Sequence, residues 1–560
     1  MDSKITRLSR AVINQAPVWV LFILGMWLVI IRPLGAQLAL VPGDLGDARF
    51  NNYVLEQFFR WASGLTRDYW NATFYYPFQW TMAFSDNLLG SAPFYALFRW
   101  ANLDQMSAFQ GWYILGCCLN FAAAGIVLGR LKLKPLAVGA GAFFFTFGLP
   151  MLAQENHAQL LYHFCIPLAC FSLWKFYQAP GLKWLAALAF WTVWQFYLTI
   201  YMGVFLLFLL AAFFILLPFW TPGQTFWQRL TAWPRCLIKA WLHANRTGRI
   251  LAITAMVVLG LGLAGLLWPY FHVYRLYHFS RGWAEVSSML PRLQSYLLAD
   301  RSQIWPTASI ASNLSLRHEH QLFPGLAVLV LVLAGIAGRF QTENRRLAWL
   351  HLGAALVLVI LTLDIQGFSF YQWVWRIPGL NSIRSVTRIM LVVMWPLSVF
   401  IAWAVDGFIQ QFSQQRRWMQ AAVYLVIGLL VVESVFYNHK TYAKADSQAR
   451  LDSLRQQIPE SLPANPILFV GVSQQDSNPA REIDAMLLAQ DLGWPVINGY
   501  SGNYPPGYNS PQSCKELPQL IKNYTDKNRT PSPTFNLELM KRVVPLGFDD
   551  CDPTGLGKTP

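Results

Sequence analysis

Long apolar stretches alternate with short polar segments along most of the chain, up to about residue 436. A helix needs about 20 consecutive apolar residues to cross the hydrocarbon core of a bilayer. By this measure the pattern predicts an all-α polytopic membrane protein with about 11 transmembrane helices. The fifth stretch is short and merges into the sixth, so ten or twelve spans remain open. The predicted spans cover residues 17–40, 107–128, 135–152, 158–177, 184–197, 199–219, 250–271, 322–338, 347–363, 387–406 and 419–436.

The pattern changes after residue 436. Residues 437–560 are polar, rich in Pro, Asn, Ser and Asp, and numerous enough for a small domain. Residues 466–472 and 494–497 have the apolar character of buried strands, and residues 482–491 that of a short helix. The sequence therefore predicts a transmembrane unit, residues 1–436, followed by a small C-terminal extracytoplasmic α/β domain, residues 437–560.

Composition supports a membrane protein. Hydrophobic residues make up 55% of the chain and charged residues only 13%, whereas a soluble protein has about 25% charged residues. The first apolar stretch is too long for a cleavable signal peptide and is followed by Pro-Gly, so we expect it to remain as a signal anchor. The absence of a Gly-x-x-x-x-Gly-Lys-Ser/Thr loop and of a dinucleotide fingerprint argues against a soluble nucleotide-sugar transferase.

The positive charges give an orientation. Under the eleven-span assignment, Lys and Arg residues in the short loops fall on one side, which is then the cytoplasm. This places the N-terminus inside and the C-terminal domain outside a bacterial inner membrane. The net charge of +15 is largely this topology signal, so no nucleic acid partner is expected. The outer loops within residues 41–106 and 273–388 contain no Lys, and their cations are Arg, the better bidentate partner for phosphate.

Two carboxylates follow the first span. The sequence Val41-Pro-Gly-Asp44-Leu-Gly-Asp47 holds them three residues apart at the membrane surface, in the first outer loop, residues 41–106. This arrangement suits a general base or a metal ligand. The alternative is that either Asp caps the helix that follows. Phe50, Val54, Phe58 and Trp61 are spaced as one face of an amphipathic helix lying in the membrane interface.

Further polar candidates lie in the first two outer segments. Asp86, in a Ser-Asp-Asn turn, is a third carboxylate in the first outer loop. Glu155 and His157 lie in a short loop between two spans. We expect them to face the same cavity as Asp47, although an ordinary surface loop has the same composition.

The later outer segments add charged groups. Glu319 lies in His318-Glu-His320, a group with metal-ligand chemistry but without metalloprotease spacing, and a polar contact to substrate is the favoured interpretation. Arg384 and Arg388 are one helical turn apart and could grip a lipid phosphate. Their alternative is a snorkelling anchor at the end of a span.

The C-terminal segment offers aromatic groups and two cysteines. Tyr500 and Tyr504 lie in a Gly- and Pro-rich stretch, residues 498–508, that could stack on a sugar or form an ordinary surface loop. Cys514 and Cys551 are the two cysteines predicted to lie outside the membrane, and they are candidates for a disulfide.

In combination, these features resemble the GT-C superfamily of membrane glycosyltransferases, with a distant likeness to aminoarabinose and mannosyl transferases. The resemblance rests on many spans, a long acidic first outer loop, an outer soluble tail, and several weak motifs. These motifs are Gly43-Asp-x-x-Asp47-Ala-Arg49-Phe50, Ser85-Asp86, Leu322-Phe-Pro-Gly325 and Ile383-Arg384 with Arg388. The chain departs from the family in lacking a strict Asp-Glu pair after the first span, which leaves open whether Asp44 or Asp47 is the base.

The resemblance implies a hexosyl or pentosyl transferase. Such an enzyme moves a sugar from a polyprenyl-phosphate donor to a glycan, lipid or protein acceptor on the extracytoplasmic face, with inversion. It implies Asp47 as general base beside Asp44, with Arg groups stabilising the leaving phosphate. The expected substrate-binding residues are Arg49, Asp86, Glu155, His157, Glu319, Arg384, Arg388, Tyr500 and Tyr504. A divalent metal ion is a possible cofactor, with Asp44, Asp47 and Glu319 as candidate ligands.

Three other functions remain as alternatives. A transporter or flippase would show internal repeats and ionisable residues at mid-membrane, and no repeat is evident in the sequence. A polysaccharide polymerase or ligase would use outer arginines without the acidic pair. A non-catalytic envelope-assembly protein would need neither.

Overall fold

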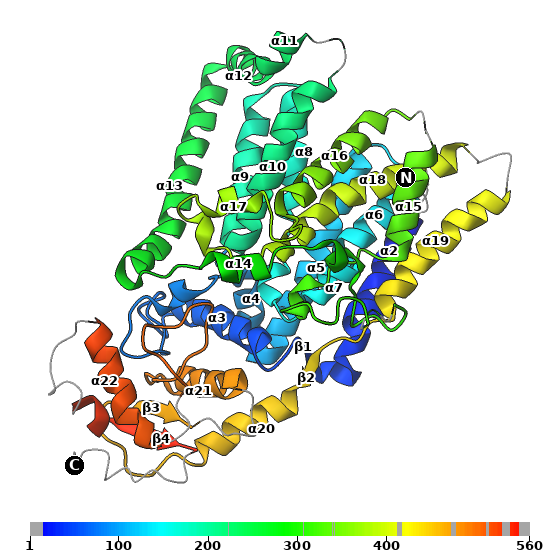
Figure 1. Cartoon of the computed structure of the whole chain (residues 1–560). Coiled ribbons are helices and arrows are strands. Elements are labelled where there is room, and N and C mark those ends of the chain that lie inside the picture. Colours follow the sequence, from blue (N-terminus) through cyan, green and yellow to red (C-terminus); the bar gives the residue numbers. More distant parts are fainter. Residues whose placement is uncertain are drawn as a thin grey trace, which may run out of the picture.

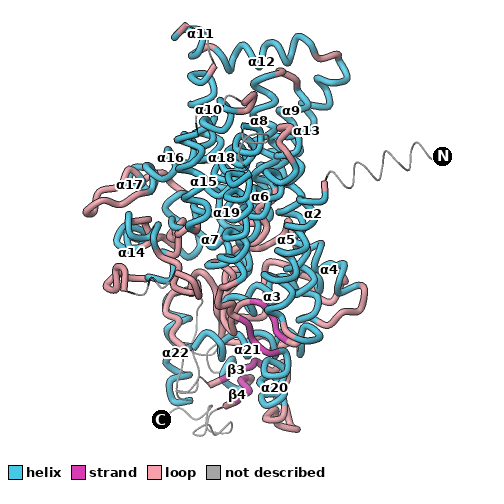
Figure 2. Tube along the Cα trace, turned by 90° about the vertical axis from the view of Figure 1, so that its right-hand side faces the viewer, coloured by secondary structure: helices cyan, strands magenta, loops and turns pink. Residues whose placement is uncertain are grey.

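Two bodies are visible in the computed structural model, a bundle of long helices and a smaller group of helices and strands at one end of it (Figure 1). The structure describes residues 15–547, apart from residues 222, 224, 306, 308, 339, 341, 412–416, 472–477, 511–513 and 529–537. The smaller group contains the C-terminal elements. Helices α11 and α12 lie at the opposite end of the bundle (Figure 2).

Each of the eleven predicted spans coincides with a helix of the bundle. The helices are α2 (Ala16–Leu24, continued by irregular turns to Leu34), α5 (Gln105–Arg130), α6 (Pro135–Phe147) with α7 (Leu149–Ala153), α8 (Cys165–Gln178), α9 (Leu182–Leu198), α10 (Ile200–Trp220), α13 (Arg246–Tyr277), α15 (Leu326–Gly338), α16 (Arg345–Thr362), α18 (Met390–Gln411) and α19 (Arg417–Val435). Among the described residues, 8 helices are long and apolar enough to cross a membrane, and two further apolar helices are shorter. The chain is a multi-pass membrane protein, and the count of eleven stays a prediction.

Helix α18 forms the centre of the bundle. The apolar window of this helix is 94% buried, and it packs against α6, α15 and α16. Its Trp395 and Trp403 are almost completely buried. By contrast, the window of α13 is only 6% buried, although this helix is strongly apolar. An apolar helix at the edge of the bundle (Figure 1) is a surface suited to lipid rather than water.

A short antiparallel strand pair joins the segment that follows the first predicted span to the segment that follows the last one. Strand β1 (Leu40–Pro42) pairs with β2 (Thr441–Ala443), in the register Val41 opposite Tyr442. The turn that follows requires a glycine, because Gly43 has φ +95° and a Cβ there would lie 2.4 Å from the Cβ of Ala48. This pairing fixes where α3 (Asp47–Ala62) begins, and therefore where Asp47 lies.

Helix α3 is placed differently from the prediction. Its residues from Ala48 to Gln57 are buried on all sides rather than along one apolar face, and only its end is open, where Trp61 is exposed. Helix α3 packs against α4 (Ala92–Trp100) and α21 (Asn478–Leu492). The predicted helix is thus present. However, the C-terminal elements cover the side that the interfacial interpretation left free.

The C-terminal elements include a parallel strand pair. Strand β3 (Ile467–Val470) pairs with β4 (Val543–Leu546), and Leu468 also bridges to Val496. The strand expected at 466–472 and the helix expected at 482–491 are therefore β3 and α21. Helices α20 (Lys444–Arg455) and α22 (Leu517–Asn528) complete this group. Treating residues 437–560 as an independent domain stays a prediction.

Four short helices lie outside these groups: α11 (Phe226–Leu230), α12 (Ala232–His243), α14 (Trp283–Ser288) and α17 (Tyr371–Trp375). Cys514 is disulfide-bonded, and its predicted partner Cys551 lies outside the described residues.

Candidate active site

A cavity of about 190 Å³ lies where the bundle meets the C-terminal elements. Its walls come from the start of α3, the loop before α4, the start of α10, the loop before α18 and the segment around residues 500–503. Segments from very different parts of the sequence therefore meet here. The predicted residues that line it are Asp47, Asp86, His157, Arg384, Arg388 and Tyr500.

Four charged groups form a continuous network beside the cavity, and three of them, Asp47, His157 and Arg388, line it. The Asp47 Oδ2 atom lies 2.7 Å from His157 Nδ1, and His157 Nε2 lies 3.5 Å from Glu319 Oε1. Glu319 in turn accepts from Arg388, whose Nη2 is 2.8 Å from Oε1 and whose Nε is 3.3 Å from Oε2. Negative and positive groups thus alternate from Asp47 to Arg388. Such a network holds each side chain in one position because every partner is itself held.

The charges set the protonation of this network. Burial opposes ionisation of Asp47, but the hydrogen bond and charge of His157, with Tyr500 and Arg388, lower the pKa of Asp47 to about 2. Burial also opposes ionisation of Glu319, yet Arg388 and His157 hold the pKa of Glu319 well below its usual range. For His157, burial and Arg388 favour the neutral ring, but hydrogen bonds to the two carboxylates outweigh them and raise its pKa. Asp47 is consequently ionised at neutral pH.

The raised pKa of His157 predicts a pH-dependent stability. A group whose pKa is higher in the folded protein contributes stability that is complete below its unfolded value, about 6.5, and is lost as pH rises through the folded value. We expect the melting temperature of wild type to exceed that of His157→Gln most at about pH 6, and the difference to narrow by about 1–2 °C towards pH 9. Scanning calorimetry of the detergent-solubilised protein measures this.

The control is His318→Gln, which removes an exposed histidine that takes no part in the network from Asp47 to Arg388. A difference between wild type and His157→Gln that is constant from about pH 6 to 9 would contradict the ionic role of His157.

Two further arginines share one carboxylate at the cavity. Arg281 Nη1 lies 3.1 Å and Arg384 Nη1 3.3 Å from the same oxygen, Oε1 of Glu285. Burial and then the neighbouring charge of Arg384 lower the pKa of Arg281. Two cations against one anion leave a positive charge uncompensated at the wall. An anionic ligand group such as a phosphate would neutralise it.

Asp86 has a structural role within the same wall. Its Oδ2 accepts from the Thr199 hydroxyl and its Oδ1 from the Ile200 backbone N–H, both at 2.9 Å. The extended Thr199 separates α9 from α10, so Asp86 satisfies an otherwise free N–H at the start of α10. Burial raises the pKa of Asp86. Asp86 thus contacts the break between α9 and α10, which are the fifth and sixth apolar stretches.

Four predicted residues lie elsewhere. Asp44 accepts from the backbone N–H of Gly46 at 3.1 Å and does not line the cavity; Gly46 itself is the N-cap of α3, which no side chain caps. Arg49 is buried in an ion pair with Asp484. Glu155 does not join Asp47; it pairs with Arg301 and with His439. The partly exposed Tyr504 stacks on Tyr508 and does not line the cavity, whereas Tyr500 donates to Asp47 at 2.6 Å.

A metal ion does not fit these carboxylates as they are arranged. Cationic side chains of the protein already neutralise both carboxylates, His157 beside Asp47 and Arg388 with His157 beside Glu319. Asp44 is turned to the helix backbone. Among the residues that the structure describes, no group of three or more His, Cys, Asp or Glu side chains could hold a metal ion. No step is therefore assigned to the candidate metal ligands.

The sequence interpretation missed several lining residues. Arg281 belongs to the Lys-free outer set but is distinguished only by its contacts: it donates to Asn503 Oδ1 at 2.9 Å and to the Gly502 carbonyl. Tyr201 lies under the Arg388 guanidinium, with 5.5 Å from Cζ to the ring centroid. The Arg281–Glu285 spacing of four residues was the available signal for an ion pair, although Arg281 precedes α14 rather than lying on it.

Comparison with known proteins gives distant structural likenesses. No family model matches the chain, and no curated protein matches it in sequence. Solved structures that resemble it include the oligosaccharyltransferase AglB from Archaeoglobus fulgidus, with an inhibitory peptide and dolichol-phosphate (14% identity, TM-score 0.46). An Archaeoglobus fulgidus oligosaccharyltransferase in the apo form also resembles it (12% identity, TM-score 0.49). Each of these matches covers 87% of this chain and 64% of that one, so the chain spans less than two thirds of AglB.

Another likeness is the arabinofuranosyltransferase AftD from Mycobacteria, at 14% identity and a TM-score of 0.44, over 81% of this chain and 29% of that one. These TM-scores describe a distant similarity of the chain trace.

Proposed function

We propose that the protein is a membrane glycosyltransferase that moves a sugar from a polyprenyl-phosphate donor to an acceptor on the predicted extracytoplasmic face. One observation carries this proposal: an ionised Asp47 and the uncompensated Arg281–Arg384 pair line the same cavity. A base for an acceptor hydroxyl and a positive site for a departing phosphate are the two groups that glycosyl transfer requires.

Asp47 is ionised at neutral pH and can accept a proton from a substrate hydroxyl. A carboxylate has about four lone-pair sites, and Tyr500 and His157 use two of them, so sites remain for a substrate hydroxyl. As the acceptor oxygen bonds to the anomeric carbon, its proton passes to Asp47. The bond from that carbon to the phosphate oxygen breaks, and the electron pair leaves with the phosphate. Attack from the side opposite the phosphate inverts the anomeric centre.

The arginines stabilise the departing phosphate. Arg281 and Arg384 already face each other across Glu285, so charge developing on the phosphate is met without rearrangement of the protein. The Arg388 guanidinium is held by Glu319, and the same carboxylate lies 3.5 Å from His157 Nε2, so Glu319 links the two cationic side chains. We therefore assign Arg388, Glu319 and His157 to the positioning of Asp47.

The cavity size limits what enters it. About 190 Å³ is smaller than the roughly 300–1,000 Å³ of pockets that enclose a drug-sized ligand. The cavity accommodates the reacting sugar and phosphate, while the polyprenyl chain and the bulk of the acceptor remain outside.

A transfer assay tests the proposal. The purified full chain is reconstituted in vesicles with radiolabelled polyprenyl-phosphate sugars and an envelope extract that supplies acceptors. Label that moves from the lipid to an acceptor supports the transferase. Label that crosses the bilayer while still attached to its lipid, with no transfer for any sugar, overturns it in favour of a flippase.

Arg384→Gln provides a test of the phosphate site. Losing a charged hydrogen-bond donor to a phosphate is expected to lower kcat/KM for the donor lipid by about 10- to 100-fold. Arg384→Lys should recover part of this loss, because lysine restores the positive charge but cannot donate two parallel hydrogen bonds as a guanidinium does. Steady-state kinetics over donor concentration measure the effect.

The control for Arg384 is Arg376→Gln, an exposed arginine of the same outer segment that does not line the cavity. Equal losses for Arg376→Gln and Arg384→Gln would mean that general surface charge, rather than the cavity, attracts the donor.

A further inference from the structure

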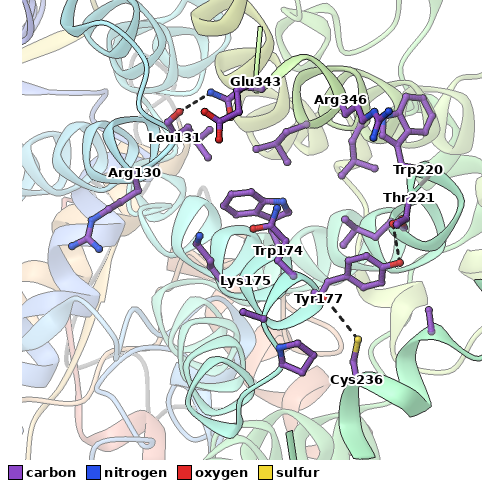
Figure 3. A pocket seen from close by; sticks show the side chains of 18 of the residues that line it. Arg130, Leu131, Trp174, Lys175, Tyr177, Trp220, Thr221, Cys236, Glu343 and Arg346 are labelled. Atoms are coloured by element: carbon purple, nitrogen blue, oxygen red, sulfur yellow. Dashed lines mark hydrogen bonds between the residues drawn. The ribbon is translucent and has the colours of Figure 1, made fainter. Parts of the chain in front are cut away.

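A second, larger cavity lies at the opposite end of the helices. It measures about 910 Å³ and is formed by the loop from α5 to α6, the end of α8, the end of α10, helix α12 and the start of α16 (Figure 3). In Figure 2 helices α11 and α12 mark this end, remote from β3 and β4. The loops that meet here are those that the charge pattern assigns to the cytoplasm.

The cavity is strongly positive. Six cations line it against a single carboxylate, Glu343. In the described part of the chain, none of these six forms an ion pair with a carboxylate of the protein. Their charge is thus compensated only by solvent ions or by a ligand. The cations are Arg130, Lys132, Lys175, Arg235, Lys239 and Arg346.

The floor and walls of the cavity are apolar and aromatic. Trp174, Trp220 and Leu217 line it together with the cations. The ammonium group of Lys175 lies 4.5 Å from the centroid of a Trp174 ring, so part of the aromatic surface already supports a cation. Cations beside apolar walls at the end of a helix bundle match an amphiphile with an anionic headgroup.

Membrane topology alone does not account for this arrangement. The charge rule for cytoplasmic loops counts Lys and Arg near the ends of spans and does not require them to converge. Lys183 and Arg246 satisfy the rule at the same end while lying outside the cavity. The convergence of six cations from four separate segments of the chain on one concave surface is an additional property.

We propose that this cavity binds a phosphate group, and that its natural source is the headgroup of an anionic phospholipid. Basic pockets between membrane helices are established binding sites for such headgroups. The apolar walls favour a lipid over a free phosphate ion, because they offer surface for acyl chains beside the charged headgroup. This site lies outside the proposed active site and acts independently of it.

Lipid titration by native mass spectrometry tests this proposal on the detergent-solubilised full chain. The probes are short-chain phosphatidylglycerol, short-chain phosphatidylcholine and inorganic phosphate. We expect wild type to bind phosphatidylglycerol in preference to phosphatidylcholine. Removing two cations in Lys132→Gln/Arg346→Gln should weaken phosphatidylglycerol binding by about tenfold or more.

The matched control is Lys183→Gln/Arg246→Gln, which removes the same charge from exposed positions outside the cavity. This pair should leave the phosphatidylglycerol affinity within about twofold of wild type. Size-exclusion profiles and melting temperatures establish that both double variants are folded. All four substitutions are at exposed side chains, so we expect little loss of stability.

The phosphate arm identifies the source of the bound group. Millimolar inorganic phosphate that displaces phosphatidylglycerol from wild type, but does not bind the Lys132→Gln/Arg346→Gln variant, supports a phosphate site open to soluble ligands. Lipid binding that phosphate leaves unchanged, and that the double variant loses, supports the headgroup. Equal binding of the two lipids, or equal losses in the two double variants, overturns the proposal.

Discussion

Asp47→Asn is expected to lower kcat/KM for sugar transfer by about 10²- to 10⁴-fold, the range for removing a general base. The amide keeps the shape of the carboxylate and can still accept from Tyr500, which lies 2.6 Å away. It has no charge to receive a proton or to hold the imidazolium of His157 at 2.7 Å. The loss should therefore appear in kcat with little change in KM for the donor lipid.

Asp446→Asn serves as the control for Asp47, because Asp446 is an exposed carboxylate of α20 away from the cavity. Initial rates at saturating donor, with size-exclusion profiles for each variant, make the comparison. Transfer by Asp47→Asn at the wild-type rate would move the base to another carboxylate. Asp86, which also lines the cavity, would then be tested next.

Four of the residues proposed from the sequence meet in the structure, and their positions along the spans give the reason. Asp47, His157, Glu319 and Arg388 each lie beside the end of an apolar stretch predicted to emerge on the same face. When the helices pack together, polar groups at the same ends of these helices are brought close to one another. Which of these groups contact each other depends on loop geometry, which hydrophobic periodicity does not encode.

Arg49 and Glu155 illustrate that limit. Arg49 is two residues after Asp47, and at about 100° per residue a helix turns their side chains to nearly opposite sides. Asp47 faces the cavity, and Arg49 therefore faces the C-terminal elements, where Asp484 is 435 residues away in sequence. Glu155, only two residues from His157, instead forms ion pairs with Arg301 and His439, because its loop lies beside β2. Residues close in sequence therefore do not always point their side chains into the same cavity.

In the C-terminal region too, local structure was predictable and long-range contacts were not. The sequence pattern indicated strand β3 and helix α21. It did not indicate that they attach to α3, because that attachment depends on contacts between distant residues such as Arg49 and Asp484. Tyr500 was proposed for sugar stacking, whereas its hydroxyl donates to Asp47. The contact brings the C-terminal segment into the wall of the cavity. The attachment of that segment consequently affects the site itself.

Asp484→Ala is expected to lower the free energy of unfolding by about 3–5 kcal/mol, the effect of removing one partner of a buried ion pair. Asp484 is fully buried and pairs with Arg49 at 2.7 Å and with Arg450 at 2.6 Å. The Arg49 side chain is only 1% exposed, and Asp484 is its one ion-pair partner among the described residues. The variant would leave the Arg49 guanidinium buried and uncompensated. Chemical unfolding in detergent, followed by the accessibility of sites in residues 437–547 to protease, measures the loss.

Asp491→Ala on the same helix is the matched control. Its pair with Arg455, at 3.2 Å, is about 41–44% exposed, and such surface pairs contribute about 0–1 kcal/mol. Similar stabilities for Asp484→Ala and Asp491→Ala would contradict a structural role for the buried pair. If only Asp484→Ala loosens the C-terminal elements, sugar transfer should fall with it, because Tyr500 would no longer hold Asp47. The buried pair would then support the geometry of the base from the face of α3 opposite the cavity.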